Sequence, residues 1–293
     1  MKKLSLEEII KNSSDFCLWK CHEDTSNISS IGLGAIVSYI CYPSNYDVLK
    51  FIIKNFVNSN IKYVVIGNLT NTLIKSSDIV LISLKHCESY IKDAPRKTIV
   101  SSNISSNYLA LKYAKKEYDT FVALTMIPGT LGAAIYNNSS VYNMSIFNYI
   151  LKVKFIDEKG KIRSVRKPKC YYRGSSFSGR NIIILEAKFI KHYNHDSLLD
   201  YKDIVEKRRL TQPSGKSLGS IFKNGNDYKS GKLIEDAGLK GFVYNNIEIS
   251  TVHANIIVNN GGNIIDFLNV IFYIELVILL KFNIRLSKEI FIV

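Results

Sequence analysis

Apolar residues recur along this chain with two periods, one typical of helices and one typical of strands. In residues 44–60 they fall at positions 48, 49, 52, 53, 56 and 57, which predicts an amphipathic helix. Residues 61–67 form a continuous run rich in β-branched residues, which predicts a buried strand that ends at Gly67, and residues 181–190 predict another strand. The segment 151–165 predicts two strands, because Glu-Lys-Gly-Lys in its middle is typical of a hairpin turn.

The second half of the chain begins after a polar stretch at 192–203, which predicts a domain boundary near residue 193. Beyond it we expect a helix near 198–210, an apolar helix over 264–282 and a last strand over 283–293. Helices and strands alternate without a strict strand-helix-strand rhythm, which predicts an α+β fold. We therefore expect an N-terminal domain of residues 1–193 and a C-terminal domain of residues 194–293.

Neither the most apolar segment of the chain nor its N-terminus indicates a membrane protein. Asp266, Asn269 and Glu275 interrupt the apolar run at 264–282, and its longest uncharged part is too short to cross a bilayer. The basic N-terminus meets Glu7 and Glu8 at once, so it lacks the apolar core of a signal peptide. A packed helix and a cytoplasmic protein without membrane partners are the better interpretation.

The cysteines and the length agree with that interpretation. Five cysteines, an odd number without paired CxxC spacing, predict reduced thiols and no metal site. With 293 residues, of which 46% are hydrophobic and 22% charged, the chain has an ordinary globular composition and room for two or three domains.

The net charge of +14 admits two interpretations. It favours an anionic partner, such as nucleic acid, a membrane surface or a phosphorylated small molecule, or it reflects the lysine enrichment of an AT-biased genome. Lys207, Arg208, Arg209 and Lys216 form the one local basic cluster. No zinc finger, RNP motif or basic helix accompanies it, so we expect no nucleic-acid partner, and a basic polyanion-binding protein stays the alternative.

Two loops rich in small residues point to a cofactor. In residues 64–73 a strand runs into a small, polar turn, which is either a plain turn or a source of backbone N–H groups for a phosphate. In residues 127–138, Pro128 and Gly129 fix a turn, and Gly132 and Ala133 allow a close approach. Two such loops in one domain predict an extended cofactor with a diphosphate. A GxGxxG fingerprint is absent, so a Rossmann site is not supported.

Six motifs occur in an order that makes a family resemblance specific: IPGTLGAAIYNNSSVY, YYRGSSF, SLGSIFKN, LIEDAGLKGF, HANIIVNNGG and IRLSKEIFIV. Together they resemble the UDP-N-acetylenolpyruvoylglucosamine reductases of peptidoglycan synthesis, over residues 25–293. The resemblance implies an FAD-binding module of the vanillyl-alcohol-oxidase/p-cresol-methylhydroxylase type, with two subdomains split near residue 62, and a C-terminal α+β substrate-binding domain. The last strand is expected to return to the N-terminal subdomain.

The resemblance also implies the chemistry and its residues. The family uses NADPH to reduce FAD, and then reduces the enolpyruvyl ether of UDP-N-acetylglucosamine enolpyruvate to a lactyl ether. The matching catalytic positions are Arg173, Ser220 and Glu289, which are expected to meet around one flavin ring. The cofactor-binding positions are Gly67, Asn68, Leu69, Thr70, Asn71, Pro128, Gly129, Thr130, Gly132 and Ala133, and the substrate-binding positions are Lys223, Asn224 and His253.

The reaction needs these residue types. A guanidinium can hold a carboxylate and its developing enolate in bidentate fashion, so Arg173 suits the substrate carboxyl group. Glu289 can polarise the same group if a raised pKa keeps it protonated. Ser220 can give the final proton if a neighbouring cation, Lys223 or Arg173, stabilises its alkoxide. Gly219 would let substrate and flavin approach.

The cofactor side departs from the family pattern. Leu69 stands where the family's phosphate loop usually has its second glycine, which costs about 1 kcal/mol if that position needs a positive φ. The family's other cofactor motifs are blurred at 31–38, 138–143 and 287–290. Weaker FAD affinity or a shifted loop is therefore expected, with the three catalytic positions retained.

Some questions stay open in the sequence. Tyr136 and Tyr142 line either the core or a pocket. The segment between Arg173 and the strand at 181–190 is too short for the extra tyrosine loop of one subgroup, so the chain resembles the subgroup with a more open pocket. We expect the protein to be a monomer. An FAD oxidoreductase of the same fold with another substrate is the second alternative.

Overall fold

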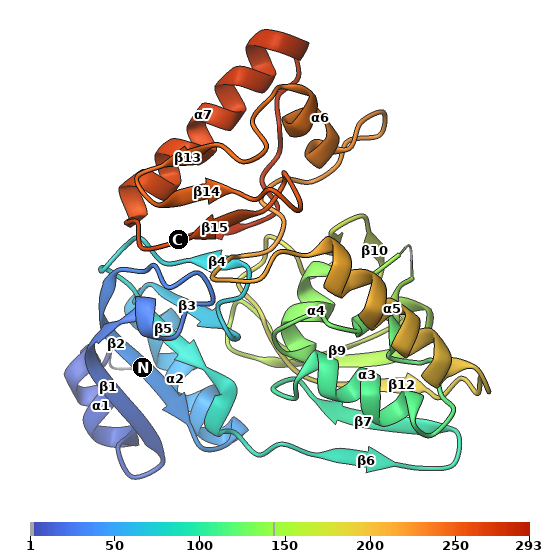
Figure 1. Cartoon of the computed structure of the whole chain (residues 1–293). Helices are drawn as coiled ribbons and strands as arrows, with labels where there is room; N and C mark the ends of the chain where they lie inside the picture. Colours follow the sequence, from blue (N-terminus) through green and yellow to red (C-terminus); the bar gives the residue numbers. More distant parts are fainter. Residues whose placement is uncertain (1–2, 143) are drawn as a thin grey trace. The chain divides into compact units, whose positions relative to one another are not determined.

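The computed structural model describes residues 3–142 and 144–293 (Figure 1). The chain forms two compact units, each assembled from separate stretches of sequence. Unit 1 contains the N-terminal stretch to Glu23, Val37–Gly67 and Asp78–Val205, and unit 2 contains Asp24–Ile36, Asn68–Ser77 and Glu206–Val293. Among the helices of the described residues, none combines the length and the apolar character that a membrane span requires.

The first sheet of unit 1 is built around a strand-helix-strand crossover. Its order is β1 (Cys17–Asp24), β2 (Ile36–Pro43), β5 (Val80–Ser83) and β3 (Tyr63–Ile66), with β2, β5 and β3 parallel. Helix α2 (Tyr46–Ser59) joins β2 to β3; it begins after Asn45, whose side chain accepts hydrogen bonds from two backbone N–H groups, and ends at left-handed Asn60. Its apolar face is buried, together with α1 (Leu6–Ser13).

The second sheet of unit 1 is antiparallel and separates two cores. Its order is β6 (Ile91–Asp93), β7 (Lys97–Ser101), β12 (Ile183–Ile190), β8 (Ile150–Ile156) and β9 (Ile162–Arg166). From β12, Ile183 and Leu185 enter the core that contains α2, whereas Ile184 and Phe189 enter the core beneath α3 (Ser106–Ala114) and α4 (Leu131–Asn137). Figure 1 shows α3 and α4 on the same face of this sheet. Burial on both faces explains why Ile183, Ile184 and Leu185 are apolar at consecutive positions.

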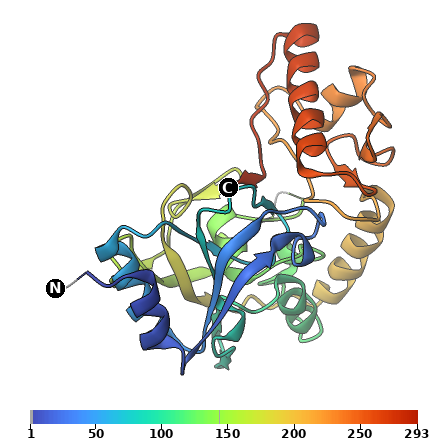
Figure 2. The same ribbon diagram turned by 90° about the vertical axis from the view of Figure 1, so that its left-hand side faces the viewer.

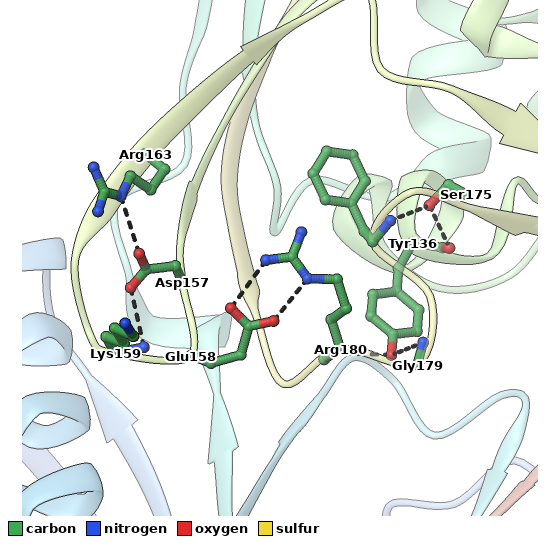
Figure 3. A network of polar contacts seen from close by, with 9 residues as sticks. Tyr136, Asp157, Glu158, Lys159, Arg163, Ser175, Gly179 and Arg180 are labelled. Carbon is green, nitrogen blue, oxygen red and sulfur yellow. Dashed lines mark hydrogen bonds and ion pairs between the residues drawn. The ribbon is translucent and has the colours of Figure 1, made fainter.

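A buried carboxylate closes the hairpin between β8 and β9 (Figure 3). Asp157 Oδ1 accepts hydrogen bonds from the backbone N–H groups of Lys159 (3.0 Å) and Lys161 (2.8 Å), and its Oδ2 accepts one from Arg163 Nε (3.0 Å). Burial alone would raise the pKa of Asp157, but these donors outweigh it and lower the pKa below its usual range. The ionised form is therefore the one that the fold stabilises.

We expect Asp157→Asn to destabilise the protein at neutral pH by about 1–2 kcal/mol, because hydrogen bonds to a charged acceptor are weakened. A lowered folded-state pKa gives stability that is present above about pH 4 and lost as the pH falls through the folded pKa. The difference between the two proteins in urea unfolding should therefore shrink on acidification. An equal difference at neutral and acid pH would contradict this role of the charge.

Unit 2 packs two helices against a small antiparallel sheet. The strands are β13 (Val243–Tyr244), β14 (Ile247–Ile249) and β15 (Ile257–Asn259), and the helices are α6 (Ser230–Asp236) and α7 (Ile264–Phe282), which lies along the sheet in both views (Figures 1 and 2). Helix α5 (Ser197–Thr211) runs from unit 1 into unit 2. Near the chain end, β16 (Phe291–Ile292) pairs in parallel with β4 (Thr72–Leu73). Short 3₁₀ helices occupy Thr25–Asn27, Leu84–His86, Val122–Leu124 and Ile146–Asn148.

The structure confirms most of the predicted elements and corrects one. The helices at 44–60, 198–210 and 264–282, the strands at 61–67 and 181–190 and the hairpin at 151–165 are all present. The predicted last strand over 283–293 is wrong for most of its length, because only Phe291 and Ile292 form a ladder. Before them, Lys288 makes a single bridge with Phe222, so this extended segment changes partner instead of continuing one sheet.

Candidate active site

Ser220 lies on a short extended segment of unit 2 that is held on both sides by main-chain pairing. It forms an antiparallel bridge with Ile256, and Ile221 N donates to Asn255 O (2.9 Å). The buried Asn255 amide then bonds both backbone groups of Phe222, at 3.0 and 2.8 Å. The hydroxyl of Ser220 is thus carried by a fixed backbone and is partly exposed.

Gly219 prepares that position through its backbone conformation. Its φ of 72° lies in the left-handed region that favours glycine. Among the described residues, and apart from the two chain neighbours of Gly219, no atom lies within 4 Å of the place where its Cβ would stand, so the space beside this turn is open. The glycine is therefore required by the turn, and the open space agrees with the predicted approach of a ligand.

Glu289 lies on the chain segment next to that of Ser220. Its backbone N–H donates to Ile221 O (2.7 Å), the residue after Ser220, and its carbonyl accepts a hydrogen bond from Asn71 Nδ2 (3.2 Å). Asn71 O in turn accepts from Phe291 N (2.9 Å). The predicted phosphate loop and the predicted catalytic carboxylate are thus joined within unit 2, although 218 positions separate them in the sequence.

Lys223 and Asn224 continue the same segment toward α6. Lys223 N donates to Ser287 O (2.8 Å), and its carbonyl accepts from Ser230 Oγ (2.5 Å). Asn224 Oδ1 accepts from Ser230 N (3.0 Å), at the first residue of α6. The side-chain oxygen of Asn224 therefore helps to start a helix, a structural role that the sequence did not indicate.

His253 is fixed in one tautomer by its surroundings. Its Nδ1 accepts a hydrogen bond from Asn255 N (3.3 Å), which places the proton of the neutral ring on Nε2. Burial lowers the pKa of His253, and the positive charges of Lys240 and Arg208 lower it further. At neutral pH the ring is thus an uncharged hydrogen-bond donor rather than a cation.

Arg173 stands in unit 1, at the tip of the hairpin formed by β10 (Cys170–Tyr171) and β11 (Gly174–Ser175). Its backbone has a φ of 51°, and its Nη1 donates to Ser140 O (3.3 Å). A Cβ on Gly174 would stand 2.1 Å from the ring of Tyr171, so a larger residue there would require this exposed ring to move. The guanidinium lies 5.7 Å from the centroid of the Tyr172 ring.

The C-terminal end of α4 holds this hairpin in place (Figure 3). Tyr136 O accepts hydrogen bonds from Ser175 Oγ (2.8 Å) and Ser178 Oγ (2.5 Å), and its hydroxyl accepts from Gly179 N (2.9 Å). Asn138 Nδ2 donates to Tyr171 O (2.9 Å). Tyr136 is therefore a framework residue beside the Arg173 hairpin. Tyr142 is exposed, so it does not belong to the core.

Gly67, the first residue of one predicted cofactor loop, lies beside the other predicted loop in unit 1. A Cβ on Gly67 would lie 3.3 Å from Thr130 Oγ1 and 3.6 Å from the Cβ of Ala133. Gly129 has a φ of 103°, which favours glycine, and its carbonyl accepts from Ser106 N (3.0 Å). These contacts put small residues from two distant segments side by side, as an extended cofactor would require.

The start of α4 does not supply free N–H groups to a phosphate. Leu131 N donates to Ile104 O (2.9 Å), Gly132 N to Ser102 O (2.8 Å) and Ala133 N to Thr130 Oγ1 (3.4 Å). A Cβ on Gly132 would come within 3.0 Å of the Ser102 Cβ. Packing of α4 against Ser102 therefore requires a small residue at position 132, and the cofactor role of Gly132 stays a prediction. The other predicted positions are Asn68 and Pro128, both exposed, and Thr70, which is half-buried.

The segment beneath α4 carries polar atoms that fit a ligand and that sequence reasoning missed. Among the described residues, Ser102 Oγ, Asn103 Oδ1 and Ser106 Oγ are buried without a hydrogen-bond partner. Such atoms are uncommon in native folds and call for a bound partner. Ser102 and Ser106 bond the Gly129–Ala133 turn through their backbones, whereas the Asn103 amide bonds Leu84 O and Cys87 O. The two buried serines beside this turn therefore fit a polar, extended group such as FAD. The Ser-rich sequence at 101–106 was the available signal.

Leu69 takes the conformation expected of the glycine it replaces. Its φ is 48°, and it is buried with 3% of its surface exposed. Ser30 N donates to its carbonyl (3.2 Å), while Ser30 Oγ donates to Ser217 O (2.6 Å), close to Ser220. The loop of unit 2 therefore keeps a left-handed turn at Leu69, at a cost of about 1 kcal/mol.

Two substitutions at Leu69 separate the cost of backbone strain from the stability gained by burying the side chain. Leu69→Ala removes a buried side chain at a cost of about 2–5 kcal/mol and keeps the strain. Leu69→Gly loses the same contacts and releases the strain, so it should be the more stable variant by about 1 kcal/mol, although both are less stable than the parent protein. Urea unfolding measures this order. An alanine variant as stable as the glycine variant would show that the turn is unstrained.

Comparison with known proteins identifies first a class and then a family. Residues 37–166 match the sequence model of the FAD binding domain, which makes the chain a flavoprotein of that class, and residues 211–293 match that of the UDP-N-acetylenolpyruvoylglucosamine reductase C-terminal domain. The reductase of Clostridium tetani is 31% identical over 94% of this chain and 92% of its own length, and that of Prochlorococcus marinus is 34% identical over 90% and 93%. The chain belongs to the UDP-N-acetylenolpyruvoylglucosamine reductase family.

A solved structure supports the fold independently. The crystal structure of the reductase from Thermus caldophilus matches with a TM-score of 0.76, covering 94% of this chain and 98% of that chain, at 19% sequence identity. At this identity the likeness concerns the fold. It extends over almost the entire length of both chains, so it includes both compact units.

Proposed function

We propose that this protein is an NADPH-dependent flavoenzyme that reduces UDP-N-acetylglucosamine enolpyruvate to UDP-N-acetylmuramate in peptidoglycan precursor synthesis. The observation that carries this proposal is the full-length similarity to reductases of that name, at 31% identity over 94% of the chain. The reaction adds a hydride and a proton across the enol ether double bond and oxidises NADPH to NADP⁺. Bound FAD supplies the hydride transfer.

The cofactor would be held by the two loops described above. Gly67 and Thr130 lie side by side, and the buried polar atoms of Ser102, Asn103 and Ser106 are suited to its polar groups. Asn68, Leu69, Thr70 and Asn71 form the accompanying turn, which keeps its left-handed residue. The first N–H groups of α4 are already satisfied, so we assign that helix to packing rather than to the diphosphate.

Three side chains would carry the chemistry on the substrate. The guanidinium of Arg173 is suited to hold the substrate carboxylate and the charge that develops on it, because its fork matches a carboxylate. Glu289, on the segment beside Ser220, would share that carboxylate as a protonated acid. Ser220 would deliver the proton that completes the reduction.

Lys223, Asn224 and His253 would bind the nucleotide part of the substrate. The neutral His253 offers an Nε2–H donor, which can bind a diphosphate oxygen without a salt bridge. Lys223 follows Ser220 on the same fixed segment, where a cation lowers the cost of a serine alkoxide. Asn224 contributes through its side-chain nitrogen, since Ser230 N donates to its oxygen.

The direct test is identification of the product. Protein loaded with FAD is incubated with NADPH and UDP-N-acetylglucosamine enolpyruvate, and the nucleotide sugar is analysed by mass spectrometry. We expect a product heavier by two hydrogens, formed in step with NADPH oxidation. NADPH oxidation that leaves the enolpyruvyl compound intact would indicate another flavin oxidoreductase. Protein that takes up no FAD and binds DNA with a steep salt dependence would indicate the polyanion-binding alternative.

A further inference from the structure

Helix α7 is apolar on all sides, including the side that faces solvent. One face buries Phe267, Val270, Ile271, Ile274 and Ile278 in the core of unit 2. The opposite face exposes Ile265 by 70%, Phe272 by 64%, Tyr273 by 40%, Leu276 by 41% and Leu280 by 75%. We name these five residues the α7 stripe. A helix that is apolar all round is normally covered on every side.

The α7 stripe carries no charge, because the charged residues of the helix are used elsewhere in unit 2. Asp266 is buried and accepts hydrogen bonds from Asn245 (3.2 Å) and Asn263 (2.7 Å). Glu275 is paired with Lys288, and Lys281 Nζ donates to Ala237 O (2.7 Å). In a chain with a net charge of +14, an uncharged apolar face of this length is the kind of surface that often marks an interaction site.

The stripe has the area that a symmetric contact needs. At roughly 200 Å² for a fully exposed large side chain, its exposed fractions correspond to about 600 Å². Two copies together would remove about 1,200 Å² from water, the lower limit for specific protein interfaces. A lipid surface fits less well, because helices that lie on membranes present a basic polar face beside the apolar one, and the second face of α7 is buried core.

The spacing of the stripe is self-complementary. If two α7 helices cross antiparallel about a twofold axis near Phe272, Ile265 of one copy comes opposite Leu280 of the other, Asn269 opposite Leu276, and Phe272 opposite Tyr273. These positions span about 22 Å along the helix at 1.5 Å per residue. We propose that the α7 stripe is the interface of a twofold-symmetric homodimer with Phe272 near its axis, in place of the monomer expected from the sequence.

Sedimentation velocity on the FAD-loaded full chain tests this directly. We expect the mass of two chains in the micromolar range, with association that strengthens as salt screens the repulsion between two copies of charge +14. Phe272→Glu should raise the dissociation constant at least about 30-fold, since it buries two opposed carboxylates at the axis. Leu210→Glu changes an apolar residue of unit 2 that is 76% exposed but lies outside the stripe, and should leave the dimer intact.

A charge swap tests the antiparallel register. Ile265→Lys and Leu280→Glu should each weaken the dimer, and an equal mixture of the two variants should associate more tightly than either alone, because the lysine of one copy meets the glutamate of the other. Unchanged circular dichroism and FAD absorbance show that each variant is folded. A monomeric parent protein, a Phe272→Glu variant that stays dimeric, or a mixture that gains nothing would overturn the proposal. So would a monomer that binds neutral lipid vesicles through Phe272.

Discussion

Ser220→Ala should reduce turnover of the enolpyruvyl substrate by about 10²–10⁴, the usual contribution of a positioned proton donor. Reduction of the flavin by NADPH should stay at the parental rate, because that half of the reaction does not need the serine proton. The methyl group is tolerated structurally, since Ser220 is held by main-chain pairing with Ile256. Stopped-flow measurement of each half-reaction separates the two effects.

The matched control is Ser214→Ala, an exposed serine six residues earlier in the same segment. It should leave both half-reactions unchanged. Ser220→Cys should retain more activity than Ser220→Ala, because a thiol can still give a proton. If Ser220→Ala reduced the enolpyruvyl substrate as fast as the parent protein, the proton would come from another group.

Arg173→Lys should lower kcat/KM for the enolpyruvyl substrate by about 10²–10³, although the positive charge is kept. The lysine ammonium is a point charge and cannot match both oxygens of a carboxylate as the guanidinium fork does. The hairpin tip has a φ of 51° with arginine already, so lysine adds no new backbone strain. The loss would therefore report on substrate binding and charge stabilisation.

Arg163→Lys serves as the control, because this arginine bonds Asp157 in the β8–β9 turn of the same unit. It should retain normal kinetics and show at most a small change in stability, because lysine keeps the positive charge and Asp157 keeps its two backbone donors. Steady-state kinetics with varied substrate measure both variants. Full activity in Arg173→Lys would show that the reaction does not need a guanidinium that binds both carboxylate oxygens.

The spacing of apolar residues was sufficient to predict the helices and strands that bury one distinct face. Helices α2 and α7 and the β8–β9 hairpin follow from spacing and turn residues, and α7 has the predicted bounds. Helix α1 was missed, although Ser5 and Glu8 form a capping box that the sequence displays. The last strand was wrong because single bridges to Phe222 and a short ladder to β4 depend on tertiary partners that no local pattern reveals.

The contacts within the candidate site could likewise be predicted only in part from the sequence. The sequence indicated that Leu69 would be costly if it took a positive φ, and its φ is 48°. It gave no sign that Asn71 would bond Glu289, or that Ser102 and Ser106 would be buried beside α4. Such contacts depend on long-range packing. The catalytic and binding roles, and the division into domains at residue 193, stay predictions.

The central claim is that this chain passes reducing equivalents from NADPH through a bound flavin to an enolpyruvyl ether. The most direct test is the visible spectrum of the purified, FAD-loaded protein under anaerobic conditions. We predict that the yellow flavin absorbance is lost when NADPH is added and returns when UDP-N-acetylglucosamine enolpyruvate follows. A protein that binds no flavin, or a reduced flavin that the enolpyruvyl compound does not reoxidise, would contradict the account.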